Sequence, residues 1–196
     1  MKNISERDEL LYESKYISVL KRDDWYEYIH NRQGNGEAVM VLVYDLSDMS
    51  YPQILGRYEH TPCHTEGYNP HKDQESPKPL YLTSITGQMD KEGKSHAQVA
   101  LEELSEEAGI SAQVEDLEDL GYVYPSKMSD TKIRMFAYDG HGSGLGEVTG
   151  DGTRGEEGAF VKWENAIRVI DNANCPLIGM AYLRLLNKKV SESFLK

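Results

Sequence analysis

The chain has 196 residues, of which 39% are hydrophobic and 28% are charged. This length is typical of one domain with a substantial core, and the composition argues against wholesale disorder. The net charge of −12 opposes capture by nucleic acid or by an anionic membrane surface. No apolar run approaches the roughly 20 residues of a membrane-spanning helix, and the first residues lack the pattern of a signal peptide. We therefore expect a cytoplasmic protein with no nucleic-acid or membrane partner.

The first segments of the chain predict a β-hairpin. Residues 12–20 and 25–29 have the aromatic and β-branched composition of strands, and the polar residues 21–24 between them form a turn. We therefore divide the chain into an N-terminal β-hairpin, residues 1–35, and a main domain, residues 36–196.

The main domain begins with the pattern of a buried sheet. Residues 38–44 are a continuous apolar run, as expected of a strand that is covered on both faces. Residues 54–58 and 80–85 predict two further strands. The polar, proline-containing stretch 61–79 between them is interpreted as a long surface loop, either a substrate lid or, more simply, a solvated insertion.

One helix is strongly predicted near the middle of the chain. Ser95 and Gln98 form a capping-box pattern, and the apolar residues that follow recur at helical spacing up to Gly109, which suits a left-handed cap. The helix should therefore span residues 96–108.

The rest of the chain alternates short strands with a terminal helix. Strands are predicted near 120–124, 133–138 and 158–163, a glycine-rich segment at 139–155, and a helix at 176–186. Two helices among several strands predict an α/β or α+β domain.

The predicted central helix carries four carboxylates in six residues. Glu103, Glu106 and Glu107 stand at positions i, i+3 and i+4, so their side chains converge on one face. Carboxylate oxygens grouped in this way suit Mg²⁺ or Mn²⁺. A solvated acidic face is the alternative that the charges alone leave open.

Residues 87–110 resemble the Nudix box, which reads Gly, five residues, Glu, seven residues, then Arg-Glu-aliphatic-x-Glu-Glu-x-Gly-aliphatic. The family's Arg is Glu102 here, the family's first Glu is Lys94, and one extra residue follows Gly87. Because that Glu and Arg pair in the family, Lys94 and Glu102 would keep the pair with exchanged signs. The second half of the box matches at Glu103, Leu104, Glu106, Glu107, Gly109 and Ile110.

Further short matches are similar to the ADP-ribose and ADP-sugar pyrophosphatase branch of this superfamily. They are residues 13–17 with Trp25, residues 85–90, and residues 170–173, in the family's order. The resemblance implies an α/β Nudix fold, an α/β/α sandwich with an N-terminal β-hairpin. It also implies a homodimer, because that branch exchanges its hairpin between subunits.

The resemblance implies a metal-dependent hydrolase. Glu103 and Glu107 would be the principal ligands of Mg²⁺ or Mn²⁺, Glu106 would bind a further ion or its water, and the carbonyl of Thr86 would complete the cluster. The ions would polarise the attacked phosphorus and lower the pKa of bound water. The products from a nucleoside diphosphate sugar would be nucleoside monophosphate and sugar phosphate.

Other residues are assigned to the substrate and to catalysis. Glu156 and Glu157 fall where the branch places a loop carboxylate that orients or deprotonates the attacking water, although ordinary loop acids would look the same. Arg57, Trp25 and Tyr28 are assigned to substrate binding. The two aromatic residues could stack on a base, yet strand aromatics are more often core residues.

Several alternatives stay open or are disfavoured. The altered box could belong to a binding or regulatory module without turnover, or to a hydrolase of a dinucleoside polyphosphate or nucleoside triphosphate. A zinc site at His60, Cys63 and His64 lacks a fourth ligand, and the glycines of 140–146 lack the Lys-Ser/Thr of a phosphate-binding loop.

Overall fold

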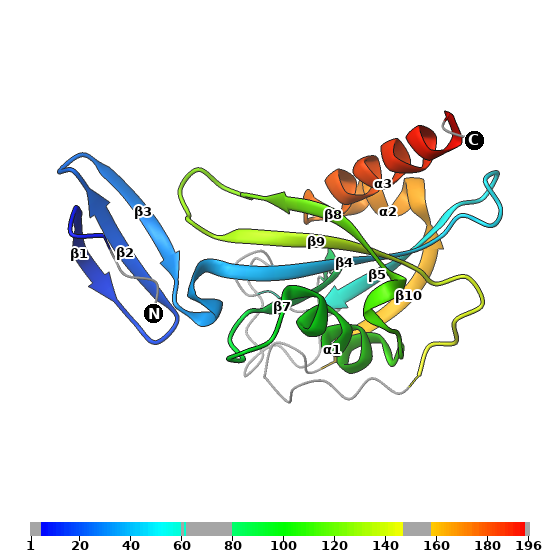
Figure 1. The fold of residues 1–196 in the computed structure, drawn as a ribbon, viewed down its shortest axis with the longest axis horizontal. Helices are drawn as coiled ribbons and strands as arrows, with labels where there is room; N and C mark the ends of the chain where they lie inside the picture. The colour runs from blue at the N-terminus through cyan, green and yellow to red at the C-terminus, as the bar shows by residue number, and fades with distance from the viewer. Residues whose placement is uncertain (1–4, 60, 62–79, 147–157, 195–196) are drawn as a thin grey trace.

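The structure is a computed structural model that describes residues 5–59, 61, 80–146 and 158–194. These residues form two β-sheets, three α-helices and two short 3₁₀ turns (Figure 1). The strands are β1 (Asp8–Glu13), β2 (Ile17–Arg22), β3 (Tyr26–Asn31), β4 (Glu37–Asp45), β5 (Gln53–Glu59), β6 (Tyr81–Thr83), β7 (Ile85–Gln88), β8 (Leu117–Val123), β9 (Lys132–Asp139) and β10 (Phe160–Asn165). The helices are α1 (His96–Ala108), α2 (Ala166–Asn172) and α3 (Leu177–Phe194), and the 3₁₀ turns are η1 (Gln33–Gly36) and η2 (Val114–Asp116).

The N-terminal unit is a three-stranded antiparallel sheet, in the order β1-β2-β3, rather than a single hairpin. The predicted strand 12–20 is broken at Ser14, whose hydroxyl accepts hydrogen bonds from the backbone N–H groups of Tyr16 at 3.3 Å and Ile17 at 3.1 Å. A serine turn of this kind reverses the chain without glycine or proline, so the sequence pattern did not reveal it.

The main sheet has the order β10-β5-β4-β9-β8, with β6 paired to β5 and β7 paired to β4. Strand β4 is parallel to β9 and antiparallel to β5 and β7. The predicted strand 80–85 is divided into β6 and β7 because the chain changes partner at Ser84, whose hydroxyl donates to the carbonyl of Val41.

Two hydrophobic cores lie on opposite faces of this sheet, because alternate residues of a strand point to opposite sides. One core joins the odd-numbered residues of β4 to α1, and the other joins its even-numbered residues to α2 and α3. Figure 1 shows α1 on one side of the sheet and α2 with α3 on the other. The members from β4 are Val39, Val41 and Val43 in the first core, and Met40, Leu42 and Tyr44 in the second.

The helices confirm part of the prediction. Helix α1 has the predicted bounds, whereas α3 extends eight residues beyond the predicted end at 186. Helix α2 was missed because its seven residues give too short a periodic pattern; it is capped by Asn165, whose side chain accepts from the N–H of Ile167 at 3.1 Å. None of the described helices combines the length and the apolar character needed to cross a bilayer.

Candidate active site

Helix α1 is positioned by its two ends. The side chains and backbone of Ser95 and Gln98 form the reciprocal capping box, at 2.8 and 3.3 Å, and Gly109 takes the left-handed conformation with φ 62°. The apolar side of α1 packs on the sheet, and Glu107 lies at the edge of that side with only 4% of its surface exposed. The helix therefore holds one carboxylate inside the protein.

The buried carboxylate of Glu107 is paired with Arg57, which is 5% exposed. Arg57 lies on β5, and its Nη2 is 2.9 Å from Glu107 Oε1. The backbone N–H of Thr86 donates to the other oxygen of Glu107 at 3.3 Å, and Arg57 Nη1 donates to Glu59. One helix and two strands thus converge on a single pair of buried charges.

Glu103 lies directly against Gly87. A Cβ atom built on Gly87 would be 2.2 Å from Glu103 Oε1 and 2.4 Å from its Cδ, so any other amino acid here would displace the carboxylate from its present position. Thr86 and Gly87 are consecutive residues of β7. This end of β7 therefore lies beside the two glutamates that the sequence assigns as principal metal ligands.

The predicted pair of Lys94 and Glu102 is present at the start of this site. Lys94 Nζ donates to Glu102 Oε1, and Lys91 Nζ donates to Glu102 Oε2 at 3.0 Å. Lys91 Nζ also lies 3.8 Å from Glu106 Oε1. Lys94, and then Lys91, lower the pKa of Glu102 below its usual value by hydrogen bonding to its ionised form.

The carboxylates of this site are ligands that suit a divalent cation, but in this structure they contact lysine and arginine side chains of the same chain. Carboxylate oxygens beside a glycine that leaves room for them are ligands of the kind that Mg²⁺ and Mn²⁺ take. Within the described residues, no three His, Cys, Asp or Glu side chains converge as a metal cluster. Lysine and arginine groups contact Glu102, Glu106 and Glu107 instead.

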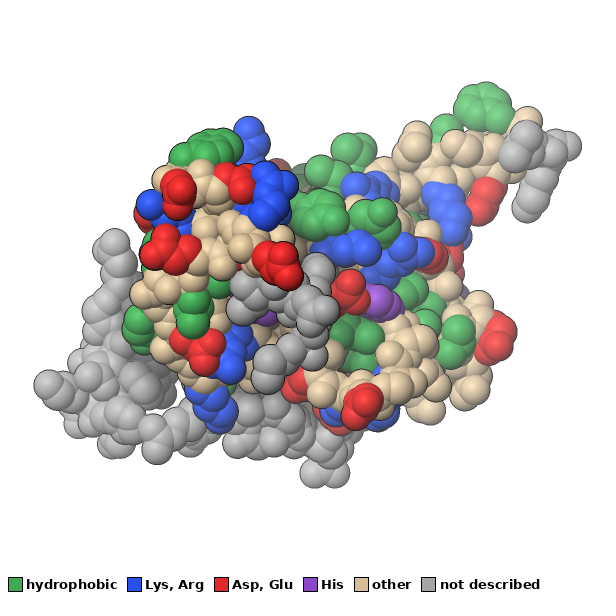
Figure 2. All heavy atoms as spheres, turned by 60° about the vertical axis from the view of Figure 1, so that its left-hand side comes forward, with side chains coloured by type: hydrophobic (Ala, Val, Ile, Leu, Met, Phe, Trp, Pro, Cys, Tyr) green, Lys and Arg blue, Asp and Glu red, His purple; other side chains and the backbone are tan. Residues whose placement is uncertain are grey.

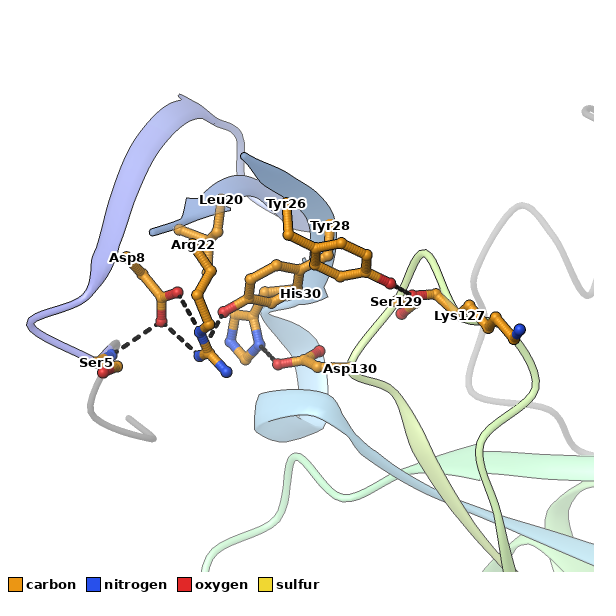
Figure 3. A pocket seen from close by; sticks show the side chains of 10 residues that line it. All are labelled: Ser5, Asp8, Leu20, Arg22, Tyr26, Tyr28, His30, Lys127, Ser129 and Asp130. Atoms are coloured by element: carbon orange, nitrogen blue, oxygen red, sulfur yellow. Dashed lines mark hydrogen bonds and ion pairs between the residues drawn. The ribbon is translucent and has the colours of Figure 1, made fainter. Parts of the chain in front are cut away.

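Two of the residues assigned to the substrate lie in or beside the N-terminal sheet. Tyr28 lines a cavity of about 340 Å³ between this sheet and the turn that connects β8 to β9, and burial raises the pKa of Tyr28 (Figure 3). Trp25 is 75% exposed. The residues that line the cavity include none of the glutamates of α1; they are Ser5, Asp8, Leu20, Arg22, Tyr26, Tyr28, His30, Lys127, Ser129 and Asp130.

Residues around this cavity connect the N-terminal sheet to the turn between β8 and β9 through hydrogen bonds. His30 Nδ1 is 2.8 Å from Asp130 Oδ2, and the phenol of Tyr26 donates to the carbonyl of Lys127. The backbone N–H of Ile29 donates to the carbonyl of Met128 at 2.8 Å. These contacts fix the N-terminal sheet relative to the main sheet within one chain.

Glu156, Glu157, His60, Cys63 and His64 lie outside the described residues, as does nearly all of the stretch 61–79. The glycine-rich segment is described only in part. Within it, Gly140 and Gly146 allow close packing: a Cβ on Gly140 would lie 2.7 Å from Trp163, and one on Gly146 would lie 2.6 Å from the carbonyl oxygen of Gly109.

Two residues that contact the site, Lys91 and Glu59, were not predicted from the sequence. Glu59 stands two residues after Arg57 on a strand, a spacing that puts both side chains on the same face. Lys91 precedes Lys94 by three residues in a segment that is neither helix nor strand. In such a segment, the spacing of two residues does not predict where their side chains point. The contact of Glu59 with Arg57 could therefore have been predicted from the sequence, whereas the contacts of Lys91 could not.

No family model matches the sequence, and no curated protein does. A crystal structure of an ADP compounds hydrolase matches with a TM-score of 0.64 and 17% identity, covering 94% of this chain and 92% of that chain. A structure of a C. elegans Ap4A hydrolase binary complex matches with a TM-score of 0.48 and 16% identity, covering 79% of this chain and 98% of that chain. The first similarity, over nearly the full length of both chains, confirms the predicted fold: the chain is an α/β/α sandwich with an N-terminal antiparallel sheet and shares the fold of that hydrolase.

Proposed function

We propose that the chain hydrolyses the diphosphate bond of ADP-ribose or a related nucleoside diphosphate sugar with Mg²⁺ or Mn²⁺. The observation that carries the proposal is the placement of Glu103 and Glu107 beside Thr86 and Gly87, next to a buried arginine. The solved structure with the same fold is described as an ADP compounds hydrolase, which supports a substrate with an ADP portion.

The roles follow from the chemistry of the side chains. Glu103 and Glu107, with the carbonyl of Thr86, would hold the principal ion, and Glu106 would serve a further ion or its water. Bound ions would neutralise the diphosphate and supply an ionised water at neutral pH. Arg57 would donate to a phosphate oxygen, for which its planar guanidinium is well suited.

We assign the orientation or deprotonation of the attacking water to Glu156 or Glu157. Support comes from the described residues that follow them. Val161 pairs with Arg57 in the β10–β5 register. The described strand β10, which starts at Phe160, therefore runs beside the strand that carries Arg57.

We also propose that the protein acts as a homodimer through its N-terminal sheet, where Trp25 and Tyr28 could contact the base. A group of exposed hydrophobic side chains in and beside this sheet supports the dimer: Leu10, Leu11, Tyr12, Tyr16, Ile17, Trp25 and Ile29. Figure 2 shows this part of the molecule toward the viewer, with hydrophobic, acidic and basic side chains interleaved. The exposed aromatic residues among them are of the kind that is enriched in protein–protein contacts.

The second candidate is a Nudix-fold binding or regulatory module without turnover. It is favoured by the lysine and arginine groups that contact Glu102, Glu106 and Glu107, because these cations would oppose the entry of a metal ion. A third candidate is a hydrolase of another nucleotide class.

Incubation with a panel of substrates distinguishes the three. The protein is mixed with Mg²⁺ and, in turn, ADP-ribose, other nucleoside diphosphate sugars, a dinucleoside polyphosphate and ATP, and nucleoside monophosphate is followed by chromatography. We expect equal amounts of nucleoside monophosphate and sugar phosphate from a diphosphate sugar, and none in EDTA. Binding of the panel without turnover supports the module, and turnover of only the other nucleotides supports the third candidate.

A further inference from the structure

The ion pair of Arg57 and Glu107 is the most buried contact between opposite charges in the described part of the candidate site. The side chains are 6% and 4% exposed, and Arg57 Nη2 lies 2.9 Å from Glu107 Oε1. A buried charge is tolerated only where it is paired and hydrogen-bonded. In the protein without metal, each of these two groups therefore stabilises the other.

The guanidinium has a second fixed partner. Its Nη1 donates to Glu59, which is two residues along the same strand. The other terminal nitrogen, Nη2, contacts Glu107 of α1. The two terminal nitrogens of one guanidinium thus contact carboxylates from two different elements, and only one of these carboxylates is an assigned metal ligand.

We propose that Arg57 exchanges partners during the catalytic cycle: it neutralises Glu107 in the metal-free protein and donates to a phosphate oxygen of the nucleotide once Glu107 holds a divalent ion. This inference rests on the proposed function and adds the order of events at that site. The contact with Glu59 stays in place and keeps the guanidinium near the diphosphate.

The exchange follows from the charges at Glu107. Arg57 Nη2 lies 2.9 Å from Glu107 Oε1, so the guanidinium would repel a divalent ion on this carboxylate unless Arg57 moves away. Glu59 still accepts from Nη1 after the move, and a new anionic acceptor would stabilise the buried nitrogen that leaves Glu107. A phosphate oxygen accepts charge-assisted hydrogen bonds from arginine readily.

A direct consequence is that metal and nucleotide bind cooperatively. Metal releases Arg57 for the phosphate, and a phosphate that holds Arg57 frees Glu107 for metal, so by linkage each ligand increases the affinity for the other equally. Arg57 thereby weakens the binding of metal alone and strengthens the binding of nucleotide. A residue with only a structural role would strengthen both.

The test measures the two affinities separately. Binding of Mn²⁺ without nucleotide is followed by electron paramagnetic resonance, and binding of α,β-methylene-ADP, whose bridging carbon resists hydrolysis, by calorimetry. We expect Arg57→Gln to bind Mn²⁺ about 5-fold or more tightly than the wild type, within the usual range of coupling between sites. We expect the same variant to bind the analogue with Mn²⁺ more weakly.

Lys162→Gln is the matched control for the lost positive charge. Lys162 lies on β10, one residue after the partner of Arg57, and pairs with Glu164 at 2.7 Å. Its side chain points to the other face of the sheet, because neighbouring residues of a strand alternate. A gain in Mn²⁺ affinity that is equal in this variant and in Arg57→Gln is a general charge effect and overturns the inference.

A second variant covers the case in which Arg57→Gln does not fold. Glu107→Gln removes the charge that pairs with Arg57. In EDTA, this variant should therefore bind α,β-methylene-ADP several-fold more tightly than Glu106→Gln. Glu106→Gln is the control, because it removes the same charge one residue away. Equal affinities of these two variants overturn the exchange. A wild type that binds neither Mn²⁺ nor the analogue overturns the proposed function itself.

Discussion

Lys94 donates a hydrogen bond to Glu102 across eight residues of sequence, and thereby joins the loop before α1 to the helix. In the Nudix box that residues 87–110 resemble, a glutamate and an arginine stand at these two positions, so the charges here are the reverse of that pattern. Lys91 contacts the other oxygen of Glu102 at 3.0 Å. The exchanged pair therefore has a third member, which the family pattern did not predict.

A double-mutant cycle measures this contact. Lys94→Glu places two carboxylates together, and Glu102→Arg places an arginine beside two lysines, so we expect the second change to cost more stability than the first. The double variant should recover part of the loss, because the introduced guanidinium would still face Lys91. With both side chains about one third exposed, the coupling should be about 0.5–1 kcal/mol. Additive free energies of unfolding would mean that the pair does not brace the loop.

The same pair predicts a dependence of stability on acid pH. Because Lys94 and Lys91 hold the pKa of Glu102 below its ordinary value of 4.5, the unfolded state binds the proton more readily. The stabilisation is complete above about pH 5 and is lost as the pH falls through the folded-state pKa. The melting temperatures of the wild type and of Lys94→Gln should therefore differ at pH 7, and the difference should shrink as the pH falls below the ordinary pKa of a glutamate. A constant difference between the two proteins contradicts this prediction.

Gly87→Ala should remove metal binding while leaving the protein folded. The new methyl group would occupy the position of the Glu103 carboxylate, 2.2 Å from its Oε1, and overpacking of this kind costs about 1–3 kcal/mol. We expect a large loss of Mn²⁺ affinity with a modest fall in melting temperature. Gly144→Ala is the matched control, since nothing lies within 4 Å of a Cβ at that position. Equal Mn²⁺ affinity in both variants would separate Glu103 from the metal site.

Deletion of residues 1–32 should yield monomers with impaired binding of substrate. The deletion removes the exposed hydrophobic side chains of the N-terminal sheet, which are the proposed dimer contact. It also removes the contact of His30 with Asp130, so thermal unfolding is needed to check the remaining fold. Trp25→Ser, at a 75% exposed position, is the milder variant. Unchanged sedimentation and substrate affinity of the deletion variant would argue against a dimer through this sheet.

Local signals in the sequence predicted the helix that carries the acidic residues and the central strand of the main sheet. The capping box at Ser95 and the glycine at 109 give α1 its bounds, and the continuous apolar run gives β4. Strand β1 was missed in part because five of its six residues are exposed, so it shows no apolar alternation. The turn at Ser14 uses a hydroxyl rather than a glycine.

The partners of the glutamates were harder to predict for a physical reason. Arg57 and Glu107 are fifty positions apart and meet only because α1 packs on the sheet to which β5 belongs. No spacing rule connects such residues. The sequence therefore predicted which acidic residues of α1 form the site. Apart from Lys94, the lysine and arginine side chains that neutralise them were identified only from the folded structure.

The most direct test of the proposed function compares the wild type with Glu103→Gln and Glu107→Gln. Each amide keeps the shape of the side chain and removes the charge that would hold the ion. The measurement is release of AMP from ADP-ribose at saturating Mg²⁺, with circular dichroism as the check on folding. We predict turnover by the wild type and its loss in both folded variants. Wild-type turnover in either variant, or no turnover by the wild type, contradicts the assignment of this site.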